Sequence, residues 1–474
     1  MYVCYILIKH YHTKMIKTIT PIDNSLLVER KFANENEIDV ALQNTLNARR
    51  AWREETLDTR IKYLKNFVKF FLSNQNEITK SLCKQIGRPI NQCAGEMRGF
   101  EERANYMIEN AHRALKPIIS KVDSEFDNYI NKEPLGTIFI IAPWNYPFNT
   151  CVNSIVPSLL AGNTVILKHS SQTPLCAEQL FDAAKKASLP DYVFQFLHLD
   201  HSSTSKIISD KRINHVLFTG SVSGGKEVKK SIGTRFINAG LELGGKDPAY
   251  VRSDCNIEYT IENLVDGSYF NSGQSCCGIE RIYVDEKIYE NFIDGFKSLT
   301  EKYILDNPLD KSTNLGPVVR MNAAKNIRSQ VINAINQGAR NIIDKNKFKI
   351  DDGLNCYVSP SALINVNHSM KYMKEESFGP TVGIMKVSNE KEAINLMNDS
   401  DYGLTASVWT SDKEFAQSMG AKIETGTFFM NRCDYLDPGL AWTGVKDTGI
   451  GVTLSVLGFD HLIRAKSYHL RSVN

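Results

Sequence analysis

The 474-residue chain has no C-x-x-C motif, and its ten cysteines show no paired spacing. In a chain of this length, that pattern argues against a disulfide framework and against a structural zinc site. We therefore expect no bound metal and a reducing compartment, so the predicted location is the cytoplasm. The only close pair is formed by the neighbours Cys276 and Cys277.

The sequence also lacks long runs of charge of one sign. Its formal net charge is +3, and no extended Lys/Arg block occurs. Proteins that bind nucleic acid or a membrane surface through charge usually carry such a block. We therefore expect neither nucleic acid nor a membrane among the partners of this protein.

The apolar stretch near the beginning of the chain is too short for a membrane span. No small-residue cleavage site follows it, which argues against a secretory leader. We expect residues 1–14 to be a disordered extension and Met15 to open the folded part. His10 and His12 lie in that extension, where inert histidines are far more common than metal ligands.

A chain of this length exceeds one ordinary core, so two or three domains are expected. Residues 35–116 repeat apolar positions every three or four residues, which predicts helices. One of these helices is expected to run from Arg60 to the break at Gly87-Arg88-Pro89. A polar hairpin is expected near residues 117–130.

Three continuous apolar runs, residues 136–143, 163–171 and 213–221, predict strands that are buried on both faces. Helical segments separate them, which indicates a doubly wound α/β sheet. Ligands of such sheets gather beyond the carboxyl ends of the strands. A second α/β region is expected over residues 243–446, and the C-terminal tail is expected to end as a strand.

The segment FTGSVSGGKEV resembles two phosphate-binding motifs without matching either. Gly220, Gly225 and Lys226 fit the front of a P-loop, but Glu227 replaces the hydroxyl residue that would bind Mg²⁺. The segment is also not G-x-G-x-x-G. What remains is a Gly220-Ser221 turn before a helix, whose free N–H groups attract an anion. Taken alone, a purely structural turn is the simpler interpretation.

Lys168 and Glu242 are candidate site residues that each have an ordinary alternative. Lys168 ends a predicted strand, where a lysine is usually a solvated charge. Glu242 stands between two leucines, and burial there would raise its pKa toward that of a useful general base. A glutamate that points outward from a strand edge explains the same pattern equally well.

Either cysteine of the GQSCCG segment is a candidate nucleophile. A cysteine that follows Gly-Gln in a loop is well placed to hold a stabilised thiolate. Two alternatives compete with this interpretation. One is that both cysteines are small buried apolar residues, and the other is that Cys276 and Cys277 form a vicinal disulfide.

Seven motifs together resemble the NAD(P)-dependent aldehyde dehydrogenase family, over essentially the whole chain from about Met15. Each motif is weak alone, but all seven occur in the order and approximate spacing of that family. They are Pro143-Trp144-Asn145, Lys168 with QTP, FTGS with Gly225, ELGG, GQSC, EESFGP at 375–380 and GVKDTGIG at 444–451.

The resemblance implies which residues are catalytic. The family pattern, an aromatic or apolar residue followed by x-x-x-G-Q-x-C, runs here from Tyr269 to Cys276. It implies that Cys276 is the nucleophile, that Glu242 is the general base, and that Asn145 supplies an amide that stabilises the oxyanion. Cys277 is then expected to be a packing residue.

The resemblance also implies NAD or NADP as the cofactor. It assigns Lys168 to the adenosine ribose, Ser221 to the pyrophosphate and Glu376 to the nicotinamide ribose. The full set of implied cofactor-binding residues is Trp144, Lys168, Ser171, Gly220, Ser221, Gly225, Glu376 and Phe378.

The implied reaction is the oxidation of an aldehyde to the carboxylic acid. A Cys276 thiolate forms a thiohemiacetal, hydride transfer turns it into a thioester, and water activated by Glu242 hydrolyses the thioester. A CoA-acylating relative, in which a thiol resolves the thioester, is the alternative. A catalytically silent relative is less favoured because Cys276, Glu242 and Asn145 are all present.

Ser171 departs from the family pattern, which often has a glutamate three positions after the lysine. A carboxylate there would repel the 2′-phosphate of NADP, and a serine does not. We therefore predict that NADP is accepted, and a preference for NADP stays open. The segment 431–442, with Cys433, Asp434, Tyr435 and Trp442, is unusual and contains no obvious carboxylate-binding pair of arginines.

The resemblance implies three structural units. A cofactor-binding domain is expected from residues 15–114 and 134–243, and a catalytic domain from residues 244–450. Residues 115–133 and 451–474 are expected to form a small oligomerisation element. A homodimer or a homotetramer is the expected assembly.

Overall fold

The structure is a computed structural model that describes residues 15–473. The expectations for residues 1–14, including His10 and His12, lie outside the described residues. The first strand begins at Met15 and pairs antiparallel with the second to form a hairpin. These strands are β1 (Met15–Ile19) and β2 (Leu26–Lys31).

Four helices follow the hairpin, as the apolar periodicity predicts. They are α1 (Glu35–Glu54), α2 (Leu57–Leu72), α3 (Gln75–Ile86) and α4 (Ile90–Ala114). The single helix expected from Arg60 to Gly87 is wrong, because α2 and α3 are separate and meet at Ser73 and Asn74. Serine and asparagine side chains compete for backbone hydrogen bonds, which favours helix ends over helix interiors. The Ser73 hydroxyl indeed donates to the Phe70 carbonyl oxygen.

A six-stranded sheet forms the first α/β layer, with the strand order β19-β9-β8-β5-β6-β7. All neighbouring strands in it are parallel except β19, which runs antiparallel to β9. The three predicted strands are its centre, and β5 is buried at every position. The strands are β5 (Thr137–Ile141), β6 (Thr164–Lys168), β7 (Phe194–Phe196), β8 (His215–Thr219), β9 (Ala239–Glu242) and β19 (Gly449–Ile450).

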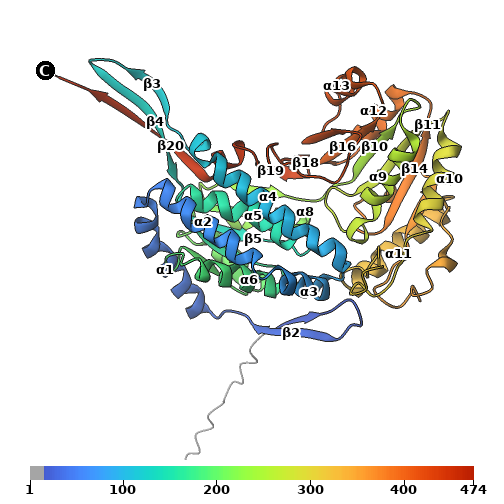
Figure 1. Ribbon diagram of the computed structural model, residues 1–474, viewed down its shortest axis with the longest axis horizontal. Helices are drawn as coiled ribbons and strands as arrows, with labels where there is room; N and C mark the ends of the chain where they lie inside the picture. The colour runs from blue at the N-terminus through green and yellow to red at the C-terminus, as the bar shows by residue number, and fades with distance from the viewer. Residues whose placement is uncertain (1–14, 474) are drawn as a thin grey trace, which may run out of the picture.

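Helices pack around this sheet, and α2, α4 and α5 lie side by side across it (Figure 1). The connecting helices are α5 (Pro147–Leu160), α6 (Pro174–Lys186), α7 (His201–Ser209) and α8 (Val222–Ile232). Strand β5 pairs on one side with β6 and on the other with β8. The strand order therefore reverses at β5, and its carboxyl end leads to Trp144 and Asn145.

A seven-stranded sheet forms the second layer, with the order β12-β13-β14-β11-β10-β16-β17. Its strands are β10 (Asp247–Val251), β11 (Ile279–Asp285), β12 (Arg340–Asn341), β13 (Ser361–Ile364), β14 (Thr381–Val387), β16 (Thr405–Trp409) and β17 (Thr427–Met430). Its helices are α9 (Ile257–Tyr269), α10 (Tyr289–Thr300), α11 (Met321–Asn336), α12 (Glu390–Asn398) and α13 (Lys413–Gly420). The short strands β15 (Tyr402–Gly403) and β18 (Val445–Lys446) pair beside it.

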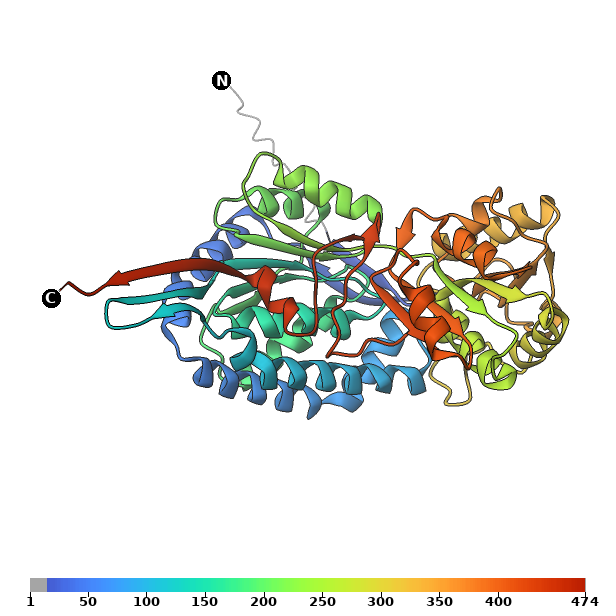
Figure 2. The ribbon, with the colours of Figure 1, turned by 90° about the horizontal axis from the view of Figure 1, so that it is seen from above.

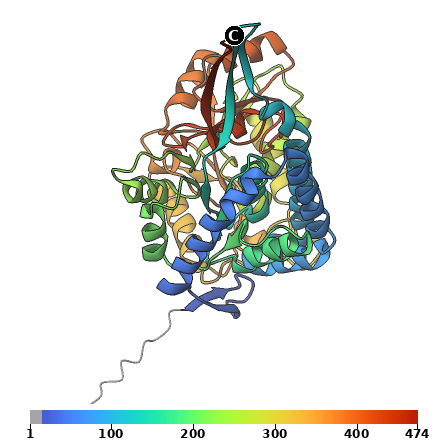
Figure 3. The same ribbon diagram turned by 90° about the vertical axis from the view of Figure 1, so that its left-hand side faces the viewer.

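A three-stranded antiparallel sheet projects from the first layer (Figures 1 and 2). It joins the expected hairpin to the C-terminal strand, with Ile463 opposite Pro134 and Arg471 opposite Phe126. Its strands are β3 (Ile118–Val122), β4 (Phe126–Pro134) and β20 (Ile463–Arg471). Figure 3 shows it at the opposite side of the molecule from the β1–β2 hairpin.

These sheets and helices confirm the predicted fold class, an α/β fold with two Rossmann-like layers and an additional small sheet. The domain boundaries stay a prediction. Within residues 15–473, no helix is both long enough and apolar enough to cross a membrane.

Candidate active site

The predicted nucleophile lies in a loop with an unusual backbone. Asn271, Ser272 and Gly273 adopt positive φ angles of 52°, 55° and 69° in succession. A Cβ atom on Gly273 would lie 2.1 Å from the carbonyl oxygen of Gly379, so only glycine fits there. The Gln274 amide fixes the loop, because its Oε1 accepts from the Val319 N–H at 2.8 Å. The Gly-Gln part of the motif therefore shapes the loop that presents Cys276.

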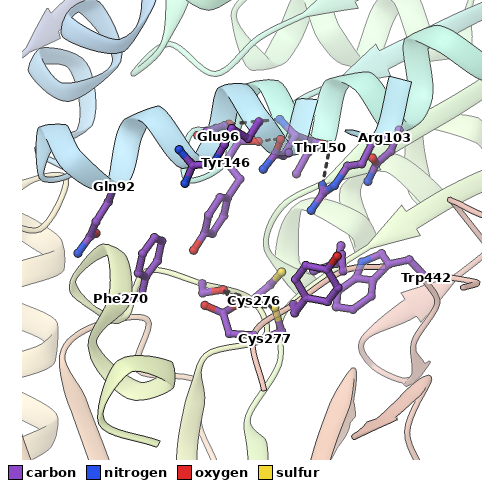
Figure 4. A pocket seen from close by; sticks show the side chains of 18 of the residues that line it. Gln92, Glu96, Arg103, Tyr146, Thr150, Phe270, Cys276, Cys277 and Trp442 are labelled. Atoms are coloured by element: carbon purple, nitrogen blue, oxygen red, sulfur yellow. Dashed lines mark hydrogen bonds between the residues drawn. The ribbon is translucent and has the colours of Figure 1, made fainter. Parts of the chain in front are cut away.

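The two cysteines have different surroundings (Figure 4). Cys276 is half-buried and lines a cavity of about 350 Å³. Cys277 also reaches this cavity, but it is only 2% exposed and its thiol donates to Asp434 Oδ1 at 2.9 Å. Its hydrogen bond with Cys276, together with burial, raises the pKa of Cys277 well above the usual value. A thiol with a raised pKa is a poor nucleophile, because the thiolate is the reactive form.

The predicted oxyanion amide belongs to Asn145, directly beyond β5. The side chain is 6% exposed, and its Nδ2 donates to the Gln274 carbonyl oxygen at 3.2 Å. The main-chain carbonyl oxygen of Asn145 accepts from the guanidinium of Arg88. The amide is therefore fixed next to the loop that carries Cys276.

A buried ion pair that sequence analysis missed supports this region. Arg88 Nη1 lies 2.5 Å from Glu96 Oε2, and both side chains are almost fully buried. Glu96 Oε1 also accepts from the N–H groups of Phe148 and Asn149, at 2.8 and 3.2 Å. Glu96 thus satisfies the first N–H groups of α5, where a negative charge is favourable. The signal in the sequence is Arg88, a charged residue within the helix break at Gly87-Arg88-Pro89.

Glu242, the predicted base, ends β9 and lines the same cavity as Cys276. Its two oxygens accept from hydroxyl groups, Oε2 from Thr219 at 3.1 Å and Oε1 from Thr453 at 2.5 Å. Burial raises the pKa of this carboxyl group above its ordinary value. A Cβ on Gly245 would lie 2.2 Å from the Cys276 carbonyl oxygen, so glycine allows the two segments to approach closely.

The residues predicted to bind the adenosine half of the cofactor lie at the carboxyl ends of β6 and β8. Burial lowers the pKa of Lys168 to about 8. The Ser171 carbonyl oxygen accepts from the Thr18 hydroxyl at 2.8 Å, so the β1–β2 hairpin lies against this corner. Ser221 caps α8, since its Oγ accepts from the Gly224 N–H at 3.2 Å. A Cβ on Gly225 would approach the Leu243 side chain to 2.7 Å.

The residues predicted to bind the nicotinamide half come together at a second cavity, of about 440 Å³. Trp144, Glu376 and Phe378 line it, and Gln274 from the nucleophile loop contributes to it as well. The Trp144 and Phe378 rings meet edge to face, with centroids 5.6 Å apart. Glu376 accepts from the Gly245 N–H at 2.9 Å, and burial raises its pKa to about 7.

Comparison with known proteins shows which proteins this chain is similar to in sequence and in fold. The family model described as "Aldehyde dehydrogenase family" matches residues 8–468. A succinate semialdehyde dehydrogenase [NAD(P)+], Sad, of Escherichia coli is 32% identical over 441 residues, which cover 93% of this chain and 95% of the relative. A 3-sulfolactaldehyde dehydrogenase of Priestia aryabhattai is 31% identical over 88% of each chain. The crystal structure of a succinic semialdehyde dehydrogenase from Streptococcus pyogenes with NADP+ superposes with a TM-score of 0.92, at 27% identity, over 96% of this chain and 100% of that one.

The chain belongs to the aldehyde dehydrogenase family. It is an NAD(P)+-dependent oxidoreductase that converts an aldehyde into the carboxylic acid. The described residues fit such a cofactor, because Lys168 offers a cation without a recorded acceptor in residues 15–473 and α8 offers free N–H groups. Glu376 offers a carboxylate for a ribose hydroxyl.

The cavity that Cys276 and Glu242 line is also lined by the unusual segment near the C-terminus. Asp434, Tyr435 and Trp442 reach the cavity, whereas Cys433 packs against α9 instead. The Tyr435 hydroxyl donates to Glu102 Oε1 on α4 at 3.1 Å. The segment therefore closes the cavity opposite α4.

Proposed function

We propose that Cys276 attacks the carbonyl carbon of a small-molecule aldehyde to form a thiohemiacetal. The observation that carries this proposal is a single cavity lined by both Cys276 and Glu242, with the Asn145 amide bonded to the Gln274 carbonyl oxygen beside it. Cys277 does not compete, because its thiol is committed to Asp434.

The oxyanion of the thiohemiacetal is stabilised by two N–H donors, the Asn145 side-chain amide and the Cys276 backbone. One preorganised donor of this kind typically contributes about 3–4 kcal/mol to the transition state. The surroundings of Asn145 support this role, since Arg88 binds its main-chain carbonyl oxygen and the Gln274 carbonyl oxygen accepts from its side-chain amide.

NAD(P)+, when bound, would accept the hydride that the thiohemiacetal loses as it becomes a thioester. Lys168, Ser171, Gly220, Ser221 and Gly225 would hold the adenosine and pyrophosphate part. Glu376 would hold the nicotinamide ribose, and Trp144 and Phe378 line the same cavity beside it. Because Ser171 brings no negative charge to the adenosine ribose, NADP is accepted.

Glu242 then removes a proton from a water molecule that hydrolyses the thioester and releases the acid. General-base assistance of this kind is typically worth about 10²–10⁴-fold in rate. The raised pKa of Glu242 supports the role, since a carboxylate of higher pKa is a stronger base.

The protein acts in the cytoplasm, and it assembles as a homodimer or homotetramer through the β3–β4–β20 sheet.

An aldehyde panel tests this function. Wild type, Cys276→Ala and Glu242→Gln are assayed for NAD(P)H formation, with and without CoA, and the products are identified. We expect free acid from wild type whether or not CoA is present, and no turnover by Cys276→Ala. Formation of acyl-CoA as the main product would replace this proposal with the CoA-acylating alternative.

A further inference from the structure

One charged side chain of the aldehyde cavity has no role in the chemistry above. Arg103 lies on the inward face of α4, among the buried residues Phe100, Ala104 and Met107, and is only 9% exposed. A buried cation destabilises a protein unless it is paired with an anion or well hydrogen-bonded. Arg88, in the break between α3 and α4, has Glu96 as its partner. Arg103 has no such carboxylate.

The hydrogen bonds of Arg103 are largely unused. Within residues 15–473, the guanidinium donates from Nη1 to the Asn149 carbonyl oxygen at 3.0 Å. A guanidinium has five N–H donors, so most of them remain available. Burial lowers the pKa of Arg103, as expected for a desolvated cation without a paired anion. Arginine nevertheless stays charged in proteins.

The carboxylates that interact electrostatically with Arg103 are already engaged. Glu102 on α4 accepts from the Tyr435 hydroxyl. Glu96 binds Arg88 and the N-terminus of α5. Glu242 accepts from two threonine hydroxyls, and Asp434 accepts from Ser275 and Cys277. No carboxylate in residues 15–473 forms an ion pair with Arg103. An anion that pairs with Arg103 would therefore come from outside the described residues.

Two asparagine side chains extend the polar surface next to Arg103. Asn149 and Asn153, on α5, are 8% and 3% exposed and line the same cavity. The Oδ1 atom of each is buried and has no hydrogen-bond partner among the described residues. An amide can be turned to present either its oxygen or its N–H₂ group. Arg103, Asn149 and Asn153, here called the α4–α5 wall, thus offer one guanidinium and two unsatisfied amides.

The α4–α5 wall faces the nucleophile across the cavity. Figure 4 shows Arg103 reaching from α4 into the space above Cys276 and Trp442. A substrate whose carbonyl carbon meets the Cys276 sulfur has room, in about 350 Å³, to extend its other end to Arg103. The two ends of the cavity therefore differ chemically, with the nucleophile at one and a cation at the other.

We propose that Arg103, helped by Asn149 and Asn153, binds an anionic group at the far end of the aldehyde, so that short aldehyde acids such as succinate semialdehyde are the preferred substrates. This rests on the proposed function and names its substrate class. The segment 431–442 lacks a pair of arginines, but the cation comes from α4 instead. The relatives named for succinate semialdehyde and 3-sulfolactaldehyde act on aldehydes that carry a carboxylate or a sulfonate.

Acidic side chains in the same cavity define the competing substrate class. Asp266 and Asp434 line it, and burial together with Asp434 raises the pKa of Asp266 to about 6. An ammonium group at the end of the substrate would favour this side. Asp434 already accepts from two donors, whereas Arg103 is buried without a paired anion. The α4–α5 wall is therefore the side that requires a ligand.

Three four-carbon aldehydes test the proposal: succinate semialdehyde, butanal and 4-aminobutanal. For wild type we expect kcat/KM for succinate semialdehyde to exceed that for butanal roughly 10- to 100-fold, the range of a hydrogen-bonded charge. Arg103→Gln should reduce this ratio at least tenfold, and Arg103→Lys should retain part of it. Arg113→Gln, which removes an exposed charge from the same helix, is the matched control and should keep the wild-type ratio.

Inhibition by succinate gives a second readout that does not depend on turnover of the acid substrate. Succinate should compete with butanal in wild type and should lose this effect in Arg103→Gln. The proposal is overturned if wild type prefers butanal or 4-aminobutanal, or if Arg103→Gln lowers kcat/KM for all three aldehydes alike. Absence of oxidation of any aldehyde by wild type would instead reject the proposed function.

Discussion

Cys276 and Cys277 are adjacent in sequence, yet their side chains have different environments. Cys277 is buried, donates to Asp434, and has a raised pKa because of its hydrogen bond with Cys276 and its burial. Cys276 is more exposed and faces the cavity that Glu242 shares. At the scale of single residues, reactivity is thus decided by the partner of each thiol and by its access to the cavity.

Removal of the Cys276 thiol and removal of the Cys277 thiol should affect activity differently. Cys276→Ala should lower kcat by roughly 10³-fold or more, the size typical for the loss of a catalytic nucleophile. Cys277→Ser keeps a donor for Asp434 and should retain most of the activity. Steady-state NAD(P)H formation measures both. Inactivity of Cys277→Ser with an active Cys276→Ala would reverse the assignment.

Glu242 should govern the acid side of the pH–rate profile for thioester hydrolysis. It acts as a base only when ionised, and burial raises its pKa above the ordinary value of about 4.3. The hydrolysis rate should therefore fall with decreasing pH at a higher pH than for an exposed glutamate. Glu242→Gln should release one NAD(P)H per active site in a burst and then turn over roughly 10²–10⁴-fold more slowly.

Rapid-mixing kinetics distinguish this role from a purely structural one. A structural defect would reduce the burst and the slow phase together. A burst of unchanged amplitude followed by slow turnover, with the acid limb of the slow phase removed, is the result expected for a base.

Ser171 should influence the choice between NADP and NAD. In Ser171→Glu, a carboxylate near the adenosine ribose should repel the 2′-phosphate and lower kcat/KM for NADP more than for NAD. The ratio of the two kcat/KM values is the measurement. A strong preference for NAD in both wild type and Ser171→Glu would contradict the prediction.

At the scale of elements, the N-terminus of α5 connects helix α4 to the candidate active site. Glu96 on α4 satisfies the first N–H groups of α5 and pairs with Arg88, and Arg88 in turn holds the Asn145 carbonyl oxygen. One buried ion pair therefore fixes the position of α5 and the backbone of the residue that supplies the oxyanion amide.

Loss of this ion pair should destabilise the protein and disturb the active site together. Glu96→Gln leaves the Arg88 charge buried and unpaired, which typically costs about 3–5 kcal/mol. We expect a clearly lower Tm and a lower kcat. Glu77→Gln, in the exposed Lys80–Glu77 pair of α3, is the control and should change Tm little. Equal Tm values for both variants would show that the buried pair contributes nothing.

Helices, strands and turns could be predicted from the sequence where a short segment carries one clear pattern. The apolar runs of β5, β6 and β8 and the turn at Gly87 are such signals. The break at Ser73 was missed because polar residues of its kind also occur on exposed helix faces. The Arg88–Glu96 pair was missed because nothing in the sequence near either residue shows that the two side chains form an ion pair.

The position of Arg103 in the sequence could have identified it as a candidate site residue. It stands at an apolar position of the helical repeat of α4, three residues after Phe100 and four before Met107. A charge at such a position predicts a buried partner or a ligand. What sequence cannot supply is the cavity, because its walls come from α4, α5, the Cys276 loop and residues 434–442, which are far apart in the chain.

At the scale of the whole molecule, the β3–β4–β20 sheet extends away from the body of the protein (Figure 2). Strand β3 is an edge of this sheet, and its Ile118, Ile119 and Val122 are exposed. An exposed apolar edge strand favours pairing with another chain. This agrees with the predicted role of the sheet in assembly.

A charge on this edge should therefore dissociate the oligomer without unfolding the subunit. We expect wild type to have two or four times the 53.4 kDa mass of one chain in size-exclusion chromatography with light scattering. Ile119→Glu should shift the mass toward one subunit, because a carboxylate would be desolvated in the interface. Ile332→Glu, at an exposed isoleucine of α11, controls for the added charge and should assemble as wild type does. A monomeric wild type, or an Ile119→Glu variant of unchanged mass, would exclude the β3 edge as the interface.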